Sequence, residues 1–147
     1  MKIRLSPPTK AFSPLLLLFL FPVGAIGYYS LELAFRGRSH WSMAICGGLC
    51  ICLIYAANRK ASRLPLLIRA LIGSAIITAV EFVAGCILNL WLGWGIWSYS
   101  ALPFNLLGQI APAFSALWFL LCIPVCLCFS LAQKHFPRLV AKRKKAE

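Results

Sequence analysis

The sequence predicts an all-α integral membrane protein, a bundle of four transmembrane helices with both termini on the cytoplasmic side. Of its 147 residues, 61% are hydrophobic and 12% are charged, whereas a soluble domain carries about 25% charged residues. The apolar residues form long runs, and the basic residues lie between and beyond those runs. This combination indicates a membrane protein and excludes a cytosolic enzyme domain, a disordered tail and a secreted disulfide scaffold.

Four apolar runs approach the roughly 20 helical residues that cross a bilayer core about 30 Å thick. The uncharged stretch 82–133 exceeds one span, and Gly93, Gly95 and Pro103 mark the break within it. The runs lack the period-two alternation of barrel strands, so we expect helices. The expected single membrane domain, residues 1–147, divides into a basic cytoplasmic arm (1–13), spans at 14–35, 41–57, 66–92 and 110–131, and a basic cytoplasmic tail (132–147).

The beginning of the chain is also similar to a cleavable signal peptide. Basic residues precede the apolar residues 15–21, and the small residues Val23, Gly24 and Ala25 follow them. Apolar sequence continues through Ala34, however, which gives a full-length span. We therefore expect an uncleaved first helix, with cleavage as the alternative.

The distribution of Lys and Arg predicts the orientation. With both termini inside, twelve basic residues lie on the cytoplasmic side and two, Arg36 and Arg38, lie outside. The expected location is therefore the cell membrane, multi-pass, and the basic tail is expected to bind anionic lipid headgroups. No basic residue alternates with aromatic residues, so we expect no nucleic acid partner. The aromatic residues that form a belt at the outer boundary are Trp41, Trp91, Trp94, Trp97 and Tyr99.

The seven cysteines all fall inside predicted spans. Cys46 with Cys50, and Cys122 with Cys126, have the i,i+4 spacing that could place two thiolates on one metal ion. The CxxC pairs typical of metal sites are missing, and cysteine within a membrane normally packs as a small apolar residue. We therefore expect packing roles, with no metal and no cofactor.

A stripe of small and polar residues marks one face of the third predicted span. Ser74, Thr78, Glu81, Gly85 and Asn89 fall within about 80° of arc at 100° per residue. A carboxyl group at this depth costs about 2.5–3.5 kcal/mol by insertion scales, so it needs a partner or a wet cavity. Two interpretations stay open. Glu81 is either a protonated interhelical clasp or a group that binds a substrate, an ion or a proton.

Polar and aromatic residues also converge at the outer end of the predicted bundle. Glu32 and Arg36 have the i,i+4 order that favours an ion pair on a helix, which an ordinary interfacial anchor would also show. Convergence nevertheless makes this end the candidate site, either for a substrate or ion or as a structural cluster. No catalytic motif is present, so no catalytic residue is predicted. The outer polar cluster consists of Glu32, Arg36, His40, Trp41, Glu81, Asn89, Trp97, Tyr99, Asn105 and Gln109.

Residues 32–52 and 81–118 resemble a bacterial membrane family, the ABC-transporter type IV or CmpB-like permeases. The shared features are Glu32, the His40-Trp41-Ser42-Met43 run, Gly47-Gly48, Glu81 with Gly85, Trp97-Ser98-Tyr99-Ser100, and the run from Pro103 to Gln109. The family commonly has Asp where this chain has Ser98, which puts in doubt an ion or proton role at that position.

The resemblance implies a permease-like membrane component of a transport system. The chain has no nucleotide-binding motif, so an ABC permease of this kind implies a separate ATPase subunit. Four helices are few to enclose a substrate path, which implies a homo-oligomer or a second membrane subunit. Two alternatives stay open: a small structural or regulatory membrane protein, and a membrane-embedded enzyme that acts on a lipid or envelope substrate through Glu32 and His40.

Overall fold

The computed structural model describes residues 14–143. In chain order its helices are α1 (Pro14–Arg36), α2 (Trp41–Lys60), α3 (Leu66–Gly85), the π-helix η1 (Cys86–Trp91) and α4 (Pro112–Arg143). Four helical segments are long and apolar enough to cross a membrane, the third formed by α3 and η1 together. No strand occurs within residues 14–143. The predicted all-α class with four membrane-spanning helices is confirmed, and the orientation of the termini stays a prediction.

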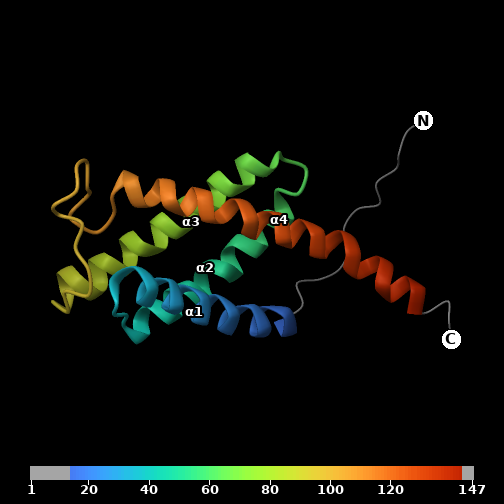
Figure 1. Cartoon of the computed structure of the whole chain (residues 1–147), viewed down its shortest axis with the longest axis horizontal. Helices are drawn as coiled ribbons and strands as arrows, with labels where there is room; N and C mark the ends of the chain where they lie inside the picture. Colours follow the sequence, from blue (N-terminus) through green and yellow to red (C-terminus); the bar gives the residue numbers. More distant parts are fainter. Residues whose placement is uncertain (1–13, 144–147) are drawn as a thin grey trace.

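The helices form two pairs that α2 joins. Figure 1 shows α1 beside α2 and α3 beside α4, and α2 also contacts both α3 and α4. The loop between η1 and α4, drawn in yellow, lies at one end of the bundle. The turn between α2 and α3 lies at the other end, where the C-terminal part of α4 also emerges (Figure 1). We call these the loop end and the turn end.

Local sequence sets where the helices begin and end. Gly37 follows α1 with a positive φ of 67°, a conformation that favours glycine after a helix. His40 caps α2, because its Nδ1 accepts a hydrogen bond from the Ser42 backbone N–H at 3.3 Å. Pro112 opens α4, since proline fits the first helical turn, where an N–H would lack a helical partner. The fourth helix therefore begins later than residue 110, the start expected from hydropathy.

The fourth helix also continues past residue 131, where the predicted fourth span ends. Its uncharged stretch ends at Gln133, but the helix runs to Arg143. Hydropathy marks where a helix leaves lipid, whereas the backbone hydrogen bonds of the helix continue through polar residues. Residues 144–147 of the predicted tail, and the predicted basic arm at 1–13, lie outside the described residues.

Glycines bring the backbones of α1 and α2 into direct contact. A Cβ added at Gly47 would lie 2.7 Å from the Gly24 carbonyl oxygen and would also overlap the Cβ of Tyr28. One added at Gly24 would lie 2.6 Å from the Gly47 carbonyl oxygen. Small residues of this kind allow close helix packing in membranes, where burial of apolar surface against lipid gains little.

The core lies between α2, α3 and α4 and contains several of the cysteines. Free Cys50, Cys122 and Cys126 pack there as small apolar side chains beside the indole of Trp118. Gly73 faces Cys122, whose Sγ lies 2.8 Å from where a Gly73 Cβ would be. The buried members of this cluster are Cys50, Ile54, Ala70, Ile77, Trp118, Cys122 and Cys126.

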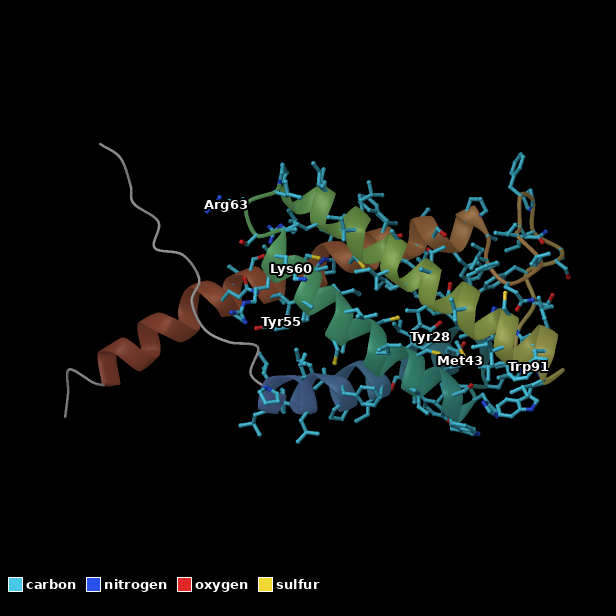
Figure 2. The ribbon with its side chains drawn as sticks, turned by 180° about the vertical axis from the view of Figure 1, so that it is seen from behind. Tyr28, Met43, Tyr55, Lys60, Arg63 and Trp91 are labelled. Carbon is cyan, nitrogen blue, oxygen red and sulfur yellow. The ribbon has the colours of Figure 1, made fainter. Side chains whose placement is uncertain are left out.

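The two ends of the bundle differ in charge. Figure 2 shows Lys60 and Arg63 at the turn end and Trp91 at the loop end. By the positive-inside rule we expect the turn end to be cytoplasmic.

A membrane-impermeant thiol reagent should therefore label Ala101→Cys in intact cells and label Ser62→Cys only after permeabilisation, each measured against the parent chain. Both positions are exposed. Labelling of Ser62→Cys in intact cells would contradict the predicted orientation.

Candidate functional site

The predicted residues of the outer polar cluster lie at or near the loop end, in several groups. The first group joins α1 to the loop. The Glu32 carboxylate is buried and accepts hydrogen bonds from Arg36 Nη1 at 2.8 Å and from Ser39 Oγ at 2.6 Å. Arg36 Nη2 donates to the carbonyl oxygen of Ile96 at 2.8 Å. The predicted i,i+4 pair is therefore formed, and it also holds the loop against α1.

The second group lies under the loop and is centred on Asn89. Its Nδ2 donates to Gln109 Oε1 at 2.9 Å and to the Trp97 carbonyl oxygen at 3.0 Å. Its Oδ1 accepts from the backbone N–H of Ile96 at 2.7 Å. Trp97 Nε1 donates to the Gln109 carbonyl oxygen at 3.1 Å, and Gln109 is only 4% exposed. Because Ile96 also binds Arg36, the first two groups form one continuous hydrogen-bonded network.

Asn89 belongs to η1, where the helix widens from α to π hydrogen bonding. The backbone N–H of Leu92 donates to the Ile87 carbonyl oxygen, five residues back, at 2.9 Å. Gly93 and Gly95 then adopt positive φ and turn the chain into the loop. The third predicted span therefore ends as a π-helix. Short π-helical segments are frequent at functional sites.

Asn105 and Tyr99 stabilise the loop itself. Asn105 Nδ2 donates to the Leu102 carbonyl oxygen at 2.7 Å, and its Oδ1 accepts from the Gly108 N–H at 2.9 Å. The Tyr99 ring stacks on Phe114 of α4, with centroids 4.4 Å apart. Burial raises the pKa of the Tyr99 hydroxyl above its ordinary value, so this group stays un-ionised at neutral pH.

Three rings form a further group on the surface of the loop end. The ring of His40 lies 5.3 Å from that of Trp41 and 5.4 Å from that of Trp94, between ring centroids. Trp41 is 59% exposed, as expected for a side chain in an interfacial aromatic belt. His40 Nδ1 lies 2.8 Å from Ser42 Oγ in addition to capping α2. Within the described residues, the hydrogen bonds of Glu32 go to Arg36 and Ser39, and those of His40 go to Ser42.

Glu81 lies deeper in the bundle and joins three helices. Its side chain is only 3% exposed. Oε1 accepts from the Tyr28 hydroxyl of α1 at 3.0 Å, and Oε2 accepts from Trp118 Nε1 of α4 at 2.8 Å. The Tyr28 and Trp118 rings are themselves 5.6 Å apart. Both carboxyl oxygens are thus paired with side chains of this chain.

The partners of Glu81 were missed at the sequence level, although signals for both exist. Tyr28 precedes Glu32 by four residues and therefore shares its helix face. Trp118 is the last residue of the segment 81–118 that resembles the transporter family.

The predicted polar stripe of α3 faces α4 and the loop. Ser74 Oγ donates to the Ser115 carbonyl oxygen at 2.7 Å, and Thr78 Oγ1 lies 3.0 Å from Ser115 Oγ. Gly85 faces Gln109, whose Cβ lies 2.8 Å from where a Gly85 Cβ would be. The stripe therefore packs against protein and not against lipid.

Gly85→Leu should destabilise the bundle by about 1–3 kcal/mol, because the new side chain displaces Gln109 and separates it from Asn89. Ile87→Leu is the control, since Ile87 is 42% exposed and the substitution hardly changes the volume of the side chain. The measurement is thermal unfolding of both variants in detergent. Equal tolerance of the two substitutions would remove the packing role of the stripe.

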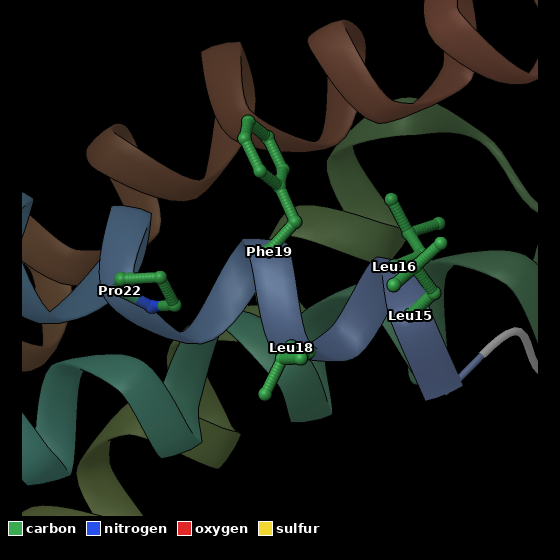
Figure 3. A pocket seen from close by; sticks show the side chains of 5 residues that line it. All are labelled: Leu15, Leu16, Leu18, Phe19 and Pro22. Carbon is green, nitrogen blue, oxygen red and sulfur yellow. The ribbon is translucent and has the colours of Figure 1, made fainter.

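An apolar groove lies on the first turns of α1, away from these polar groups. Figure 3 shows its lining, which consists of Leu15, Leu16, Leu18, Phe19 and Pro22. Lipid chains are the expected neighbours of such a surface in a membrane. The groove offers no polar side chain for chemistry.

A family model described as "Putative ABC-transporter type IV" matches residues 41–145. The chain belongs to this family. The matched region takes in α2, α3, η1, the loop and α4, and the predicted resemblance is confirmed. No curated protein and no solved structure matches the chain. Family and fold together make the chain a multi-pass membrane protein related to ABC transporters.

Proposed function

We propose that this member of the ABC-transporter type IV family is the permease-like membrane component of a transport system in which a separate subunit hydrolyses ATP. The observation that carries the proposal is the family match over residues 41–145. Those residues form membrane-spanning helices and the loop at the loop end of the bundle. What the family shares is therefore the part that lies in the membrane.

We further propose that the substrate path forms between subunits. The space between α2, α3 and α4 is filled by a core that includes the large indole of Trp118. The polar groups of Glu32, Asn89 and Gln109 are hydrogen-bonded within the chain. A tightly packed bundle of this kind suits the wall of a path, with a second copy or another membrane subunit as the opposite wall. In this proposal the network holds the loop in place and Glu81 clasps the helices.

The experiment is purification of the tagged chain from its native membrane in mild detergent, followed by identification of its partners and an ATPase assay. We expect an ATPase subunit to co-purify. The exposed Arg63, in the turn between α2 and α3, offers a cytoplasmic docking point, so Arg63→Glu should reduce co-purification. Arg38→Glu makes the same charge change at an exposed position of the loop end and should not. Absence of any ATPase from the purified complex would contradict the proposal.

A second candidate function is a small structural or regulatory membrane protein. The pairing of Glu32 and Glu81 within the chain favours it, because each oxygen of both carboxyl groups already accepts a hydrogen bond from a side chain of this chain. This candidate predicts that deletion of the gene leaves uptake unchanged and that the purified complex contains no ATPase. The same purification therefore separates the two functions.

A further inference from the structure

A second polar cluster lies at the turn end, and none of the functions above uses it. Hydrogen bonds join Asn58 on α2, Arg69 on α3 and Ser130 on α4, and Gln133 lies one helical turn beyond Ser130 on α4. We call these four residues the inner donor cluster. Arg69 Nη1 donates to Asn58 Oδ1 at 3.0 Å and to Ser130 Oγ at 2.5 Å. The guanidinium group of Arg69 therefore links three helices at one level of the bundle.

At this level α2 ends, α3 begins and the uncharged stretch of α4 ends. Asn58 lies in the last turn of α2, and Arg69 lies in the first turn of α3. On α4 the uncharged stretch ends at Gln133, which follows Ser130 by three residues and so shares its helix face. Lys60 and Arg63 lie at the same end (Figure 2). In a bilayer this is the level of the lipid headgroups.

Three buried nitrogen atoms of the cluster have no hydrogen-bond partner in the described part of the chain: Asn58 Nδ2, Arg69 Nε and Gln133 Nε2. Asn58 is only 2% exposed, and its amide orientation follows from its contact, because arginine cannot accept a hydrogen bond and must therefore face Oδ1. The Ser130 hydroxyl donates to the Cys126 carbonyl oxygen at 2.6 Å. The free groups are thus N–H donors, and leaving them unpaired within a membrane is costly.

Arg69 also lacks an acidic partner in the described residues. Glu32 and Glu81 are the acids within 14–143, and they bind Arg36 and the Tyr28–Trp118 pair instead. A ligand that satisfies the inner donor cluster must therefore supply acceptor oxygens and a negative charge. Phosphate fits both needs, and arginine binds phosphate oxygens with favourable geometry.

We propose that the inner donor cluster binds a phosphate group between α2, α3 and α4. Its level in the bundle matches the phosphate of an anionic phospholipid in the adjoining leaflet, and basic pockets between transmembrane helices bind such headgroups. Inorganic phosphate presents the same oxygens and charge, so the test distinguishes these two sources. A bound headgroup would join α2, α3 and α4 at the turn end, where Lys60 and Arg63 also lie.

The test measures thermal stability of the full chain in detergent with phosphatidylglycerol, with diacylglycerol, which lacks phosphate, and with inorganic phosphate. We expect phosphatidylglycerol to raise the unfolding temperature and diacylglycerol to leave it unchanged. Stabilisation by inorganic phosphate as well would show that the cluster binds the free phosphate ion and does not require a lipid. No stabilisation by either phosphate compound would overturn the proposal.

Two variants and one control link the effect to the cluster. Asn58→Asp keeps the acceptor for Arg69 but replaces the free donor with a charged oxygen. The affinity for phosphate should therefore fall by about tenfold. Gln133→Leu removes one donor without adding charge and should weaken binding by a smaller factor. Ser62→Asp makes a comparable charge change at an exposed position of the same end and should leave binding within about twofold. If Asn58→Asp does not fold, Gln133→Leu carries the test. A folded variant of the cluster that responds like the parent would overturn the proposal.

Discussion

Gly47→Ala is expected to push α1 away from α2 and to lower the free energy of unfolding by about 1–3 kcal/mol. A methyl group at this position would lie 2.7 Å from the Gly24 carbonyl oxygen, which belongs to the backbone and cannot rotate away. It would also overlap the Cβ of Tyr28. The helices must therefore separate along their whole crossing. Thermal unfolding of the purified variant in detergent measures the effect.

Gly27→Ala on α1 is the matched control. A Cβ at Gly27 would meet nothing within 4 Å, and alanine favours a helix over glycine by up to about 1 kcal/mol. This variant should be as stable as the parent chain or slightly more stable. If the two variants unfold at the same temperature, the close contact between α1 and α2 does not contribute to stability.

The effect of Gly47→Ala should extend beyond the contact of two helices. Tyr28 packs its Cβ against Gly47 and donates its hydroxyl to Glu81. Displacement of α1 would therefore also weaken the hydrogen bond that joins α1 to α3. In that case the destabilisation by Gly47→Ala and by Tyr28→Phe should be non-additive, as expected for residues that share a contact.

The four spans could be predicted from the sequence because lipid imposes one strong rule. Each span must be apolar over roughly 20 residues, and that pattern is visible without knowledge of any contact. The end of α4 could not be predicted in this way, since the charged residues that follow Gln133 end the membrane-spanning pattern, yet the helix continues to Arg143. The π-helix at Cys86–Trp91 likewise has no signature in hydropathy.

The candidate site was only partly predictable. The convergence of Glu32, Arg36, Asn89 and Gln109 followed from topology alone, because the ends of neighbouring spans must meet. Their hydrogen bonds could not be predicted from topology, because the link between them runs through the backbone of Ile96. The Ile96 carbonyl oxygen accepts from Arg36, and the Ile96 N–H donates to Asn89. The inner donor cluster was missed for a similar reason. Arg69 was visible in the third span, but its partners come from two other helices whose rotation the sequence does not state.

Glu81→Leu is expected to lower stability strongly, whereas Glu81→Gln should preserve it. Leucine leaves the Trp118 indole N–H and the Tyr28 hydroxyl without their acceptor, at a cost of about 1–3 kcal/mol for each buried group. Glutamine can keep both contacts. Its carbonyl oxygen accepts from Trp118, which can only donate, and its amide then donates to the Tyr28 oxygen, which can also accept.

The same two variants decide between a clasp and a charge-dependent role of Glu81. A neutral Glu81 can use the pattern of glutamine, and an ionised Glu81 can accept from both donors, so the two hydrogen bonds alone require no charge. For a clasp, Glu81→Gln should therefore retain both thermal stability in detergent and uptake in a deletion strain. A stable Glu81→Gln protein without uptake would instead show that the charge is needed, because shape and hydrogen bonding are preserved. We expect retention, since each carboxyl oxygen already has a partner within the chain and Glu81 is only 3% exposed.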